Sequence, residues 1–255
     1  MRMSEPTDPT DTMDRVPTDR AGEPDPAENR PMSIEDIQAA YAEYADWFHR
    51  LEWFDRLVTG RYRCHQFGGV DERVLDVACG TGTNFPYLAS TVDLVGVDIS
   101  PEMLQKAQER VDRLELDGTL HRMDAQSLEF DDDTFDTVIS ALSTCTFPNP
   151  VAVLREMQRV CAPDGQILLL EHGRSDVRPL AWYQDWRAEA HYQKAGCRWT
   201  QQPLELVRDA GLSVERARTA LFDMITMIDA RPGPSGRGND RSANTLISEL
   251  LPSHW

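Results

Sequence analysis

The sequence lacks any long hydrophobic run. No apolar stretch among its 255 residues approaches the ~18 residues that can cross a bilayer, and the longest candidate, at 167–170, fits a strand. The N-terminus shows no apolar segment of the kind found in a secretory signal. We therefore expect a cytoplasmic protein without stable membrane insertion.

Lysine is also scarce. Lys106 and Lys194 are the only lysines, and 43 Asp and Glu residues stand against 26 Lys and Arg residues, for a formal net charge of -17. This excess repels nucleic acids and anionic membranes over most of the surface, so we expect no nucleic-acid partner. A composition with many carboxylates and almost no lysine resembles that of proteins from salt-in halophiles, in which molar salt screens the repulsion between the carboxylates. We therefore expect a halophilic protein.

The cysteines form no CxxC pair. An odd number of cysteines without ligand spacing argues against both a disulfide framework and a zinc site. We expect buried thiols in a reducing compartment and assign no metal ligand. The five residues are Cys64, Cys79, Cys145, Cys161 and Cys197.

Composition divides the chain into three parts. Residues 1–31 are rich in Pro, Thr, Asp and Glu, bury too little to fold, and are predicted to be disordered. Residues 32–230 contain the periodic apolar patterns of a folded domain. Residues 231–255 begin with a Pro- and Gly-rich stretch typical of a flexible tail.

Strands and helices are predicted to alternate along the folded part. Such alternation indicates βαβ units around a parallel sheet, and a final hairpin fits an antiparallel edge. We expect an α/β, doubly wound, Rossmann-like fold with a seven-stranded, mostly parallel sheet and an N-terminal helical lid. Strands are predicted at 73–78, 93–98, 118–122, 135–141, 166–171, 213–219 and 221–228. Helices are predicted within 33–67 and at about 84–90, 101–112, 150–161 and 202–210, and the aromatic segment 182–199 interrupts the pattern.

The segment 73–88, "RVLDVACGTGTNFPYL", contains a glycine turn directly after a strand. A P-loop requires a lysine after the second glycine, and none follows Gly82. A dinucleotide-binding turn requires a third glycine where this chain has Phe85. What remains is a turn at which Gly80 and Gly82 let the backbone approach a ligand that carries no pyrophosphate.

Acidic residues lie at or just beyond the ends of three successive strands, at the same predicted edge of the sheet. Asp76 can face a cationic or hydroxylated group, although it can also cap the following turn. Asp98 is placed to bind both hydroxyls of a ribose. Asp124 lies where the base of the ligand would follow. S-adenosylmethionine has a ribose, a base and a positive charge but no phosphate, so it is the cofactor that this pattern predicts.

Four segments in register resemble the class I S-adenosylmethionine-dependent methyltransferases of the methyltransferase-11/UbiE-like kind. They are "VLDVACGTGTN", "LVGVDIS", "RMDAQSLEFDDDTFDTVISALS" and "REMQRVCAPDGQILLLEHG", between about residues 73 and 173. The family usually has a further glycine where this chain has Ala78. A small residue still permits the turn.

The resemblance implies a role for each segment. The loop around Ala78, Gly80 and Gly82 would contact the methionine part of the cofactor, and Asp98 the ribose. Asp124 would bind the exocyclic amine of the adenine, beside Ala125. Ser140 and Leu142 would line the methyl-transfer side. The full implied cofactor-binding set is Tyr41, Asp76, Ala78, Cys79, Gly80, Gly82, Asn84, Asp98, Ile99, Met103, Asp124, Ala125 and Ser140.

The acceptor side is less defined by sequence. "SALS" at 140–143 is not the Asn/Asp-Pro-Pro-Tyr motif of adenine or glutamine methyltransferases. The run of His172, Trp182, His191, Gly196, Cys197 and Trp199 resembles a branch of small-molecule methyltransferases that includes microsomal thiol methyltransferases and some phospholipid or quinone methyltransferases. Its aromatic residues could wall an apolar acceptor pocket.

His172 and His191 are the candidate catalytic bases, and each can equally be a hydrogen-bonded structural histidine. The partner that this interpretation predicts is a small, apolar methyl acceptor. Two alternatives stay open: a quinone or phospholipid-headgroup methyltransferase, and a regulator that binds S-adenosylmethionine without turnover. Tyr41 can close over the cofactor, as an aromatic residue does in related enzymes, or belong to the core.

Overall fold

The computed structural model describes residue 33 and residues 52–234. The predictions made for residues 1–31, for Tyr41, for most of the helical lid and for the tail after residue 234 lie outside these described residues. Within them, no helix combines the length and the apolar character needed to cross a membrane.

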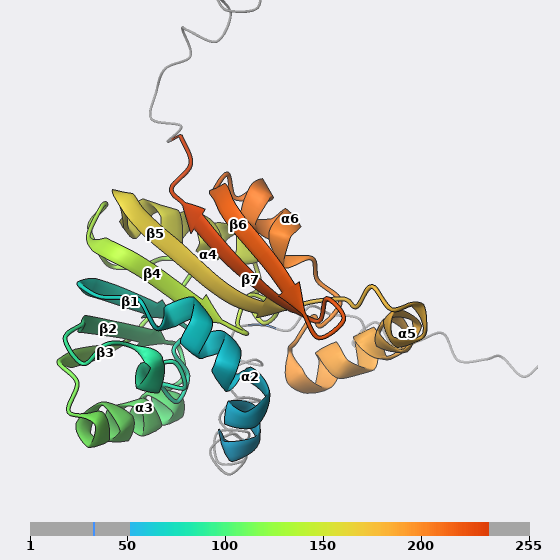
Figure 1. The fold of residues 1–255 in the computed structure, drawn as a ribbon, viewed down its shortest axis with the longest axis horizontal. Helices are drawn as coiled ribbons and strands as arrows, with labels where there is room; N and C mark the ends of the chain where they lie inside the picture. The colour runs from blue at the N-terminus through green and yellow to red at the C-terminus, as the bar shows by residue number, and fades with distance from the viewer. Residues whose placement is uncertain (1–32, 34–51, 235–255) are drawn as a thin grey trace, which may run out of the picture. The chain divides into compact units, whose positions relative to one another are not determined.

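The described elements follow the predicted alternation (Figure 1). The helices are α2 (Glu52–Phe67), α3 (Pro101–Leu114), α4 (Pro150–Val160), α5 (Arg178–Ala195) and α6 (Pro203–Asp209), with one 3-10 turn, η1 (Phe85–Tyr87). The strands are β1 (Arg73–Val77), β2 (Asp93–Asp98), β3 (Gly118–Arg122), β4 (Phe135–Ala141), β5 (Cys161–His172), β6 (Ser213–Ala220) and β7 (Ile225–Arg231).

All seven strands form one sheet in the order β3-β2-β1-β4-β5-β7-β6. The first five strands are parallel, and β7 runs antiparallel to both β5 and β6. The predicted fold class is therefore confirmed. The strand order reverses between β1 and β4, and open α/β sheets bind their ligands outside the carboxyl ends of the strands at such a switch point.

Apolar side chains cover both faces of the sheet, as a doubly wound fold requires. On one face, Leu75 and Val77 pack in a cluster with Leu154 of α4 and Val207 of α6. On the other face, a cluster joins Val74 to residues of α2 and α3, among them Phe67, Ala107 and Val111. Alternate residues of β1 thus serve opposite faces, and Asp76 belongs to the face covered by α2 and α3.

Polar caps fix where two of the covering helices begin. The Ser100 hydroxyl accepts a hydrogen bond from the Met103 amide at 3.2 Å, directly after β2. The Asn149 side chain accepts one from the Ala152 amide at 3.1 Å, and proline follows each cap at a position where a helix needs no amide donor. The caps hold the helix starts close to the carboxyl edge of the sheet.

Three local predictions were wrong. The expected helix at 84–90 is only the 3-10 turn η1, because residues 78–92 must hold both the glycine turn and the return to β2. The last strand runs over Ile225–Arg231 instead of 221–228, since residues 221–223 take positive φ angles in the hairpin turn. The aromatic segment forms helix α5, which begins at Arg178 after β5 and ends where Gly196 adopts φ +63°.

Candidate cofactor and acceptor site

The glycine turn after β1 has a left-handed backbone at three positions. φ is +54° at Ala78, +56° at Gly80 and +76° at Gly82. A Cβ on Gly82 would lie 2.5 Å from the ring of Phe85, whereas a Cβ on Gly80 would meet no heavy atom within 4 Å. Phe85 is fully buried, and so Gly82 is needed for packing within the protein. Gly80 borders open space in which a ligand can approach the backbone.

Asp98 connects the end of β2 to this turn. One of its carboxylate oxygens accepts a hydrogen bond from the Gly80 amide at 2.9 Å, and the other accepts one from the Ser100 amide at 2.9 Å. Burial raises the pKa of Asp98, against the lowering effect of these backbone donors. A carboxylate oxygen has a second lone pair, and therefore Asp98 can still accept from a ligand's hydroxyls.

Asp76 is fully buried below the turn. The Asn84 amide donates to both of its carboxylate oxygens, at 3.1 and 3.0 Å, and Arg63 of α2 donates to the Asn84 side-chain oxygen. Burial raises the pKa of Asp76 to about 7, although Asn84 and Arg63 act in the opposite direction. Arg63 could not be predicted from the sequence, because no local pattern links it to Asn84, which lies 21 positions away.

Other predicted cofactor residues surround these groups. Asp124 and Ala125 follow β3, and Asp124 accepts a hydrogen bond from the Gln126 amide at 2.9 Å. Ser140 is fully buried and donates to the Val77 carbonyl at 2.9 Å, so its hydroxyl ties β4 to β1. The structure also has Cys79 and Met103 buried and Ile99 half-buried at the same edge of the sheet. Their contacts with a cofactor stay predictions.

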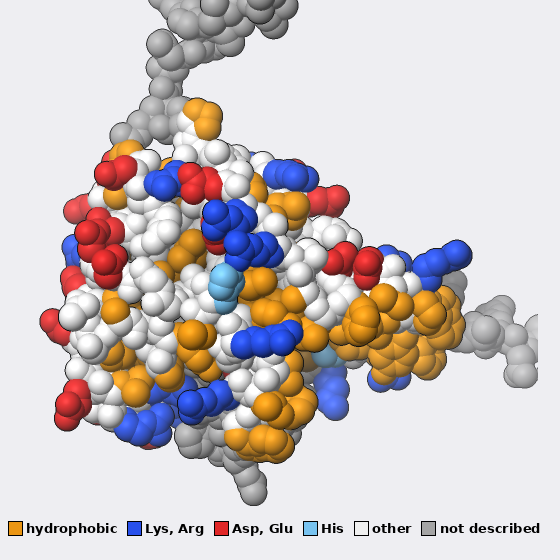
Figure 2. Space-filling model, viewed as in Figure 1, with side chains coloured by type: hydrophobic (Ala, Val, Ile, Leu, Met, Phe, Trp, Pro, Cys, Tyr) orange, Lys and Arg blue, Asp and Glu red, His pale blue; other side chains and the backbone are white. Residues whose placement is uncertain are grey.

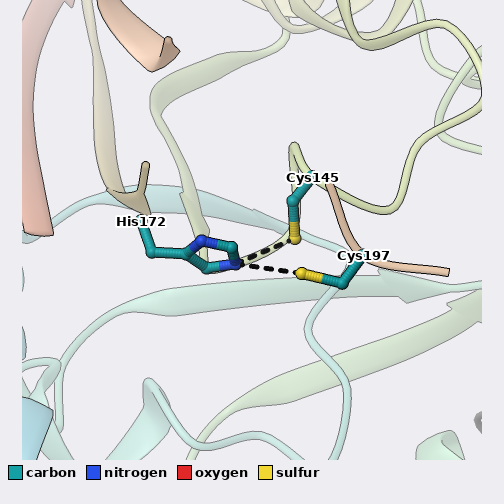
Figure 3. Close-up of side chains that lie close together, drawn as sticks. All are labelled: Cys145, His172 and Cys197. Carbon is teal, nitrogen blue, oxygen red and sulfur yellow. Dashed lines mark hydrogen bonds between the residues drawn. The ribbon is translucent and has the colours of Figure 1, made fainter. Parts of the chain in front are cut away.

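Three side chains that are far apart in the sequence meet beyond β4 and β5 (Figure 3). His172, the last residue of β5, has its Nε2 atom 3.1 Å from the Cys145 Sγ atom and 3.3 Å from the Cys197 Sγ atom. All three potential ligand atoms lie within 4.8 Å of one another. We call these residues the cysteine–histidine cluster. Four of the five cysteines are buried as expected, but the spacing along the chain did not predict that two would meet a histidine.

The cluster shifts the titration of its members. The hydrogen bond from Cys145 lowers the pKa of Cys197 to about 4, with a further contribution from His172 and against the effect of burial. The same hydrogen bond and burial raise the pKa of Cys145 well above its usual range. Burial disfavours the imidazolium form of His172, but Cys197 and Glu171 outweigh it and raise the pKa of His172. A thiolate beside an imidazolium is therefore the favoured state without a ligand.

Glu171 precedes the cluster and is fully buried. Its carboxylate accepts hydrogen bonds from the Ser143 and Thr144 amides at 3.2 and 3.3 Å, which holds the loop after β4 against β5. Burial raises the pKa of Glu171, against these donors. Sequence reasoning did not single this residue out. Leu142 in the same loop has φ +56°, a strained value of the kind that clusters at functional sites.

The aromatic residues of α5 form a surface patch. Trp182 and Trp186 are stacked with centroids 6.0 Å apart and are 66% and 65% exposed, and Tyr183 is exposed beside them. Figure 2 shows hydrophobic side chains gathered over this helix. We call Trp182, Tyr183 and Trp186 the aromatic face of α5. The expectation that aromatic residues of this segment wall an apolar acceptor pocket stays a prediction, and in this structure the Trp182 ring stands in solvent.

His191 takes a different position from His172. Its ring stacks on Trp199 with centroids 4.2 Å apart, and it adds a minor contribution to the lowered pKa of Cys197. The Trp199 indole donates to the Gln184 carbonyl at 3.1 Å and so ties this segment to α5. Both candidate bases therefore influence Cys197, a residue to which the sequence assigned no catalytic role.

Residues 74–165 match the family model described as a methyltransferase domain. The chain is 40% identical over 111 residues to the phosphatidylethanolamine N-methyltransferase of Cereibacter sphaeroides, covering 43% of this chain and 55% of that protein. It is 31% identical over 180 residues to the mitochondrial methyltransferase OMS1 of Saccharomyces cerevisiae, covering 63% of this chain and 38% of that protein. It is 32% identical over 109 residues to UbiE, the ubiquinone/menaquinone biosynthesis C-methyltransferase of Bdellovibrio bacteriovorus, covering 42% of this chain and 46% of that protein. The chain thus spans between 38% and 55% of the length of these relatives.

Solved structures share the fold at low sequence identity. A SAM-dependent methyltransferase from Aquifex aeolicus aligns with a TM-score of 0.51 and 22% identity, covering 76% of this chain and 97% of that one. The [4+2]-cyclase SpnF aligns with a TM-score of 0.57 and 18% identity, covering 70% and 80%. Since a cyclase has the same fold, the fold alone does not define the reaction.

Proposed function

We propose that this chain, whose residues 74–165 form a methyltransferase domain, transfers a methyl group from S-adenosylmethionine to a small apolar acceptor. The family and the fold imply this cofactor. The observation that carries the proposal is the carboxyl edge of β1 and β2, where open space beside Gly80 adjoins the carboxylate of Asp98. This edge suits a ligand with ribose hydroxyls and no pyrophosphate.

When bound, S-adenosylmethionine supplies a methyl group on a positively charged sulfur. The protein's part in an in-line displacement is to align the acceptor and exclude water. Gly80 lets the backbone approach the cofactor, and Asp98 accepts hydrogen bonds from its ribose. The buried carboxyl of Asp76, which accepts a hydrogen bond from Asn84, lies beneath the turn and attracts the positive charge of the cofactor.

An acceptor hydroxyl, thiol or ammonium group must also lose a proton. His172 and His191 are the sequence-based candidates for this role. Because the Nε2 atom of His172 faces two sulfur atoms, we assign proton removal to the cysteine–histidine cluster as a unit and not to one histidine acting alone.

Cofactor binding is tested by calorimetric titration of Asp98→Ala with S-adenosylmethionine. Loss of charged hydrogen bonds should weaken binding by about 1.5–3 kcal/mol, roughly ten- to hundred-fold. Asp93→Ala is the matched control, since Asp93 lies exposed at the opposite end of β2. An affinity that is unchanged in Asp98→Ala would contradict the site.

Turnover is tested by incubating the protein with methyl-labelled cofactor and a panel of thiols, phenols, quinones and amines. Transfer of label to one class identifies the acceptor. Tight cofactor binding with no transfer to any class would favour the alternative of a regulator without turnover.

A quinone or phospholipid acceptor is the second candidate. It is favoured by the relatives named for such acceptors and by the aromatic face of α5, because exposed Trp and Tyr side chains suit a lipid–water interface. Sedimentation with phosphatidylcholine vesicles tests it. Trp182→Ser should reduce vesicle binding, whereas Trp53→Ser on α2, which removes an equally exposed indole, should not.

The charge composition supports a further proposal, that the protein works in a salt-rich cytoplasm. With a net charge of -17, self-repulsion penalises compaction at low ionic strength, where the Debye length is about 30 Å at 0.01 M. The melting temperature should rise between 0.05 and 2 M KCl. A flat profile would contradict this.

A further inference from the structure

The cysteine–histidine cluster has the donor set of a zinc site. Two sulfur atoms and one imidazole nitrogen are ligands that zinc prefers, and three protein ligands with a fourth position left open are typical of catalytic zinc. In Figure 3 the Nε2 atom of His172 points between the Sγ atoms of Cys145 and Cys197. The three potential ligand atoms lie within 4.8 Å of one another.

The distances are close to those of a tetrahedral site. At the tetrahedral angle, zinc–sulfur and zinc–nitrogen bonds of about 2.3 and 2.0 Å place sulfur and nitrogen about 3.5 Å apart. The observed separations from His172 Nε2 are 3.1 Å to Cys145 and 3.3 Å to Cys197. A metal ion therefore requires each sulfur to move outward by only a few tenths of an ångström, which a small rotation of each cysteine side chain supplies.

The backbone around the cluster is fixed by contacts that do not involve the ligand atoms. The Arg198 amide donates to the Cys145 carbonyl at 2.9 Å and so joins two of the ligand segments. The Gln201 side chain donates to Thr144 at 2.7 Å and to the His172 carbonyl at 3.3 Å. The site is thus held together before a metal binds, as hydrogen bonds around the ligand residues do in known metal sites.

We propose that Cys145, His172 and Cys197 bind one zinc ion and leave its fourth coordination position open at the carboxyl ends of β4 and β5. The charges fit, since two thiolates neutralise the ion inside a largely buried site. Binding releases two protons to solvent, one from the Cys145 thiol and one from Nε2 of the His172 imidazolium. The role of the open position rests on the proposed methyl transfer: a metal there would hold the acceptor's heteroatom and lower its pKa, so that the heteroatom's proton leaves to solvent and the cluster acts through its metal.

Metal binding itself is tested on the full chain without any acceptor. Protein dialysed against zinc and then against metal-free buffer should retain one equivalent by elemental analysis. Cobalt in place of zinc should give the intense visible absorption of a tetrahedral site with thiolate ligands. Cys145→Ser, Cys197→Ser and His172→Gln should each lower the retained zinc at least tenfold.

Matched controls separate the cluster from other ligands. Cys161→Ser removes a buried cysteine of β5 and Cys64→Ser an exposed one of α2, and both should keep full zinc. Far-UV circular dichroism checks that each variant is folded. Should the wild type retain no zinc, or should Cys145→Ser and Cys161→Ser lose it equally, the metal site is excluded. A Cys145–Cys197 disulfide in protein purified under argon would also exclude it.

The open position is tested with ethanethiol added to the cobalt-loaded protein. A ligand that enters the fourth position should shift the visible bands, whereas a site closed by a fourth protein ligand should not respond. These readouts do not depend on methyl transfer. Zinc binding with no transfer would therefore refute the proposed function alone, and transfer without zinc would refute the metal site alone.

Discussion

The carboxyl edge of the sheet has two sides that are built differently. On the proposed cofactor side, after β1, β2 and β3, the candidate binding groups are mostly backbone, held in left-handed turns and by the carboxylate of Asp98. On the proposed acceptor side, after β4 and β5, the candidate groups are side chains brought together from three separate segments. A backbone site tolerates few residue types at its turns, and those turns lie directly after strands. A side-chain site depends on packing that lies far away in the sequence.

The comparison predicts where substitutions act. Changes on the cofactor side should alter the affinity for the cofactor or the stability of the turn. Changes on the acceptor side should alter turnover and leave cofactor affinity intact. The variants below test this division, starting with the largest expected effect.

The pH dependence of stability should reveal the buried carboxyl of Asp76. Its pKa is about 7 in the folded protein against 3.8 ordinarily, so the folded state binds more protons than the unfolded state between these values. The free energy of unfolding should therefore fall by up to about 4 kcal/mol as pH rises from about 4 to about 7, and then level off. Denaturant unfolding of cofactor-free protein at pH 5 and 8 measures this. Asp76→Asn should lose the effect, and Asp93→Asn should keep it.

The two glycines of the turn should respond differently to alanine. Gly82→Ala combines a positive φ with a clash against Phe85 and should cost about 3 kcal/mol of stability. Gly80→Ala has only the positive φ and should cost about 1 kcal/mol. Its methyl group enters the open space, and so cofactor affinity should fall about tenfold or more. Thermal unfolding and calorimetry together check both effects. Equal stability in the two variants would contradict the assigned packing role.

On the acceptor side, Gln184→Ala should remove the hydrogen bonds that attach α5 to the segment after β5. The buried Gln184 side chain accepts from the Ser175 amide at 2.8 Å and donates to the Gly173 carbonyl at 3.1 Å. Leaving the Ser175 amide and the Gly173 carbonyl unpaired should lower the free energy of unfolding by about 2 kcal/mol. Turnover should fall, and cofactor affinity should stay unchanged. Gln193→Ala on the exposed part of the same helix is the control and should change stability by less than about 0.5 kcal/mol. A loss of cofactor affinity in Gln184→Ala would break the division between the two sides.

Ala78→Gly should be slightly stabilising. Ala78 holds φ at +54°, which costs an alanine about 1 kcal/mol that a glycine does not incur. We expect a higher melting temperature and no loss of cofactor affinity. A lower melting temperature would mean that packing of the alanine methyl group stabilises the fold by more than the positive φ angle destabilises it.

The two sides also differ in what the sequence could predict. The strands, the glycine turn and Asp98 follow from local patterns, because each lies within a few residues of a strand end. The cluster could not be predicted, since Cys145 and Cys197 are 27 and 25 residues from His172 with no motif between them. The contact of Arg63 with Asn84 could not be predicted for the same reason. The prediction of a helix at 84–90 was wrong because the short connection to β2 overrides local helix propensity.

The position of β7 has a consequence for how the chain folds during synthesis. β6 is made before β7 but lies at the edge of the sheet, so it has no partner until β7 inserts between it and β5. Until residue 231 has been synthesised, β5 exposes the backbone edge of its apolar segment 167–170. Such an open edge invites pairing with another chain. Nascent chains that stall before β7 are therefore the species most prone to aggregate, and the hairpin of β6 and β7 closes that edge in one late step.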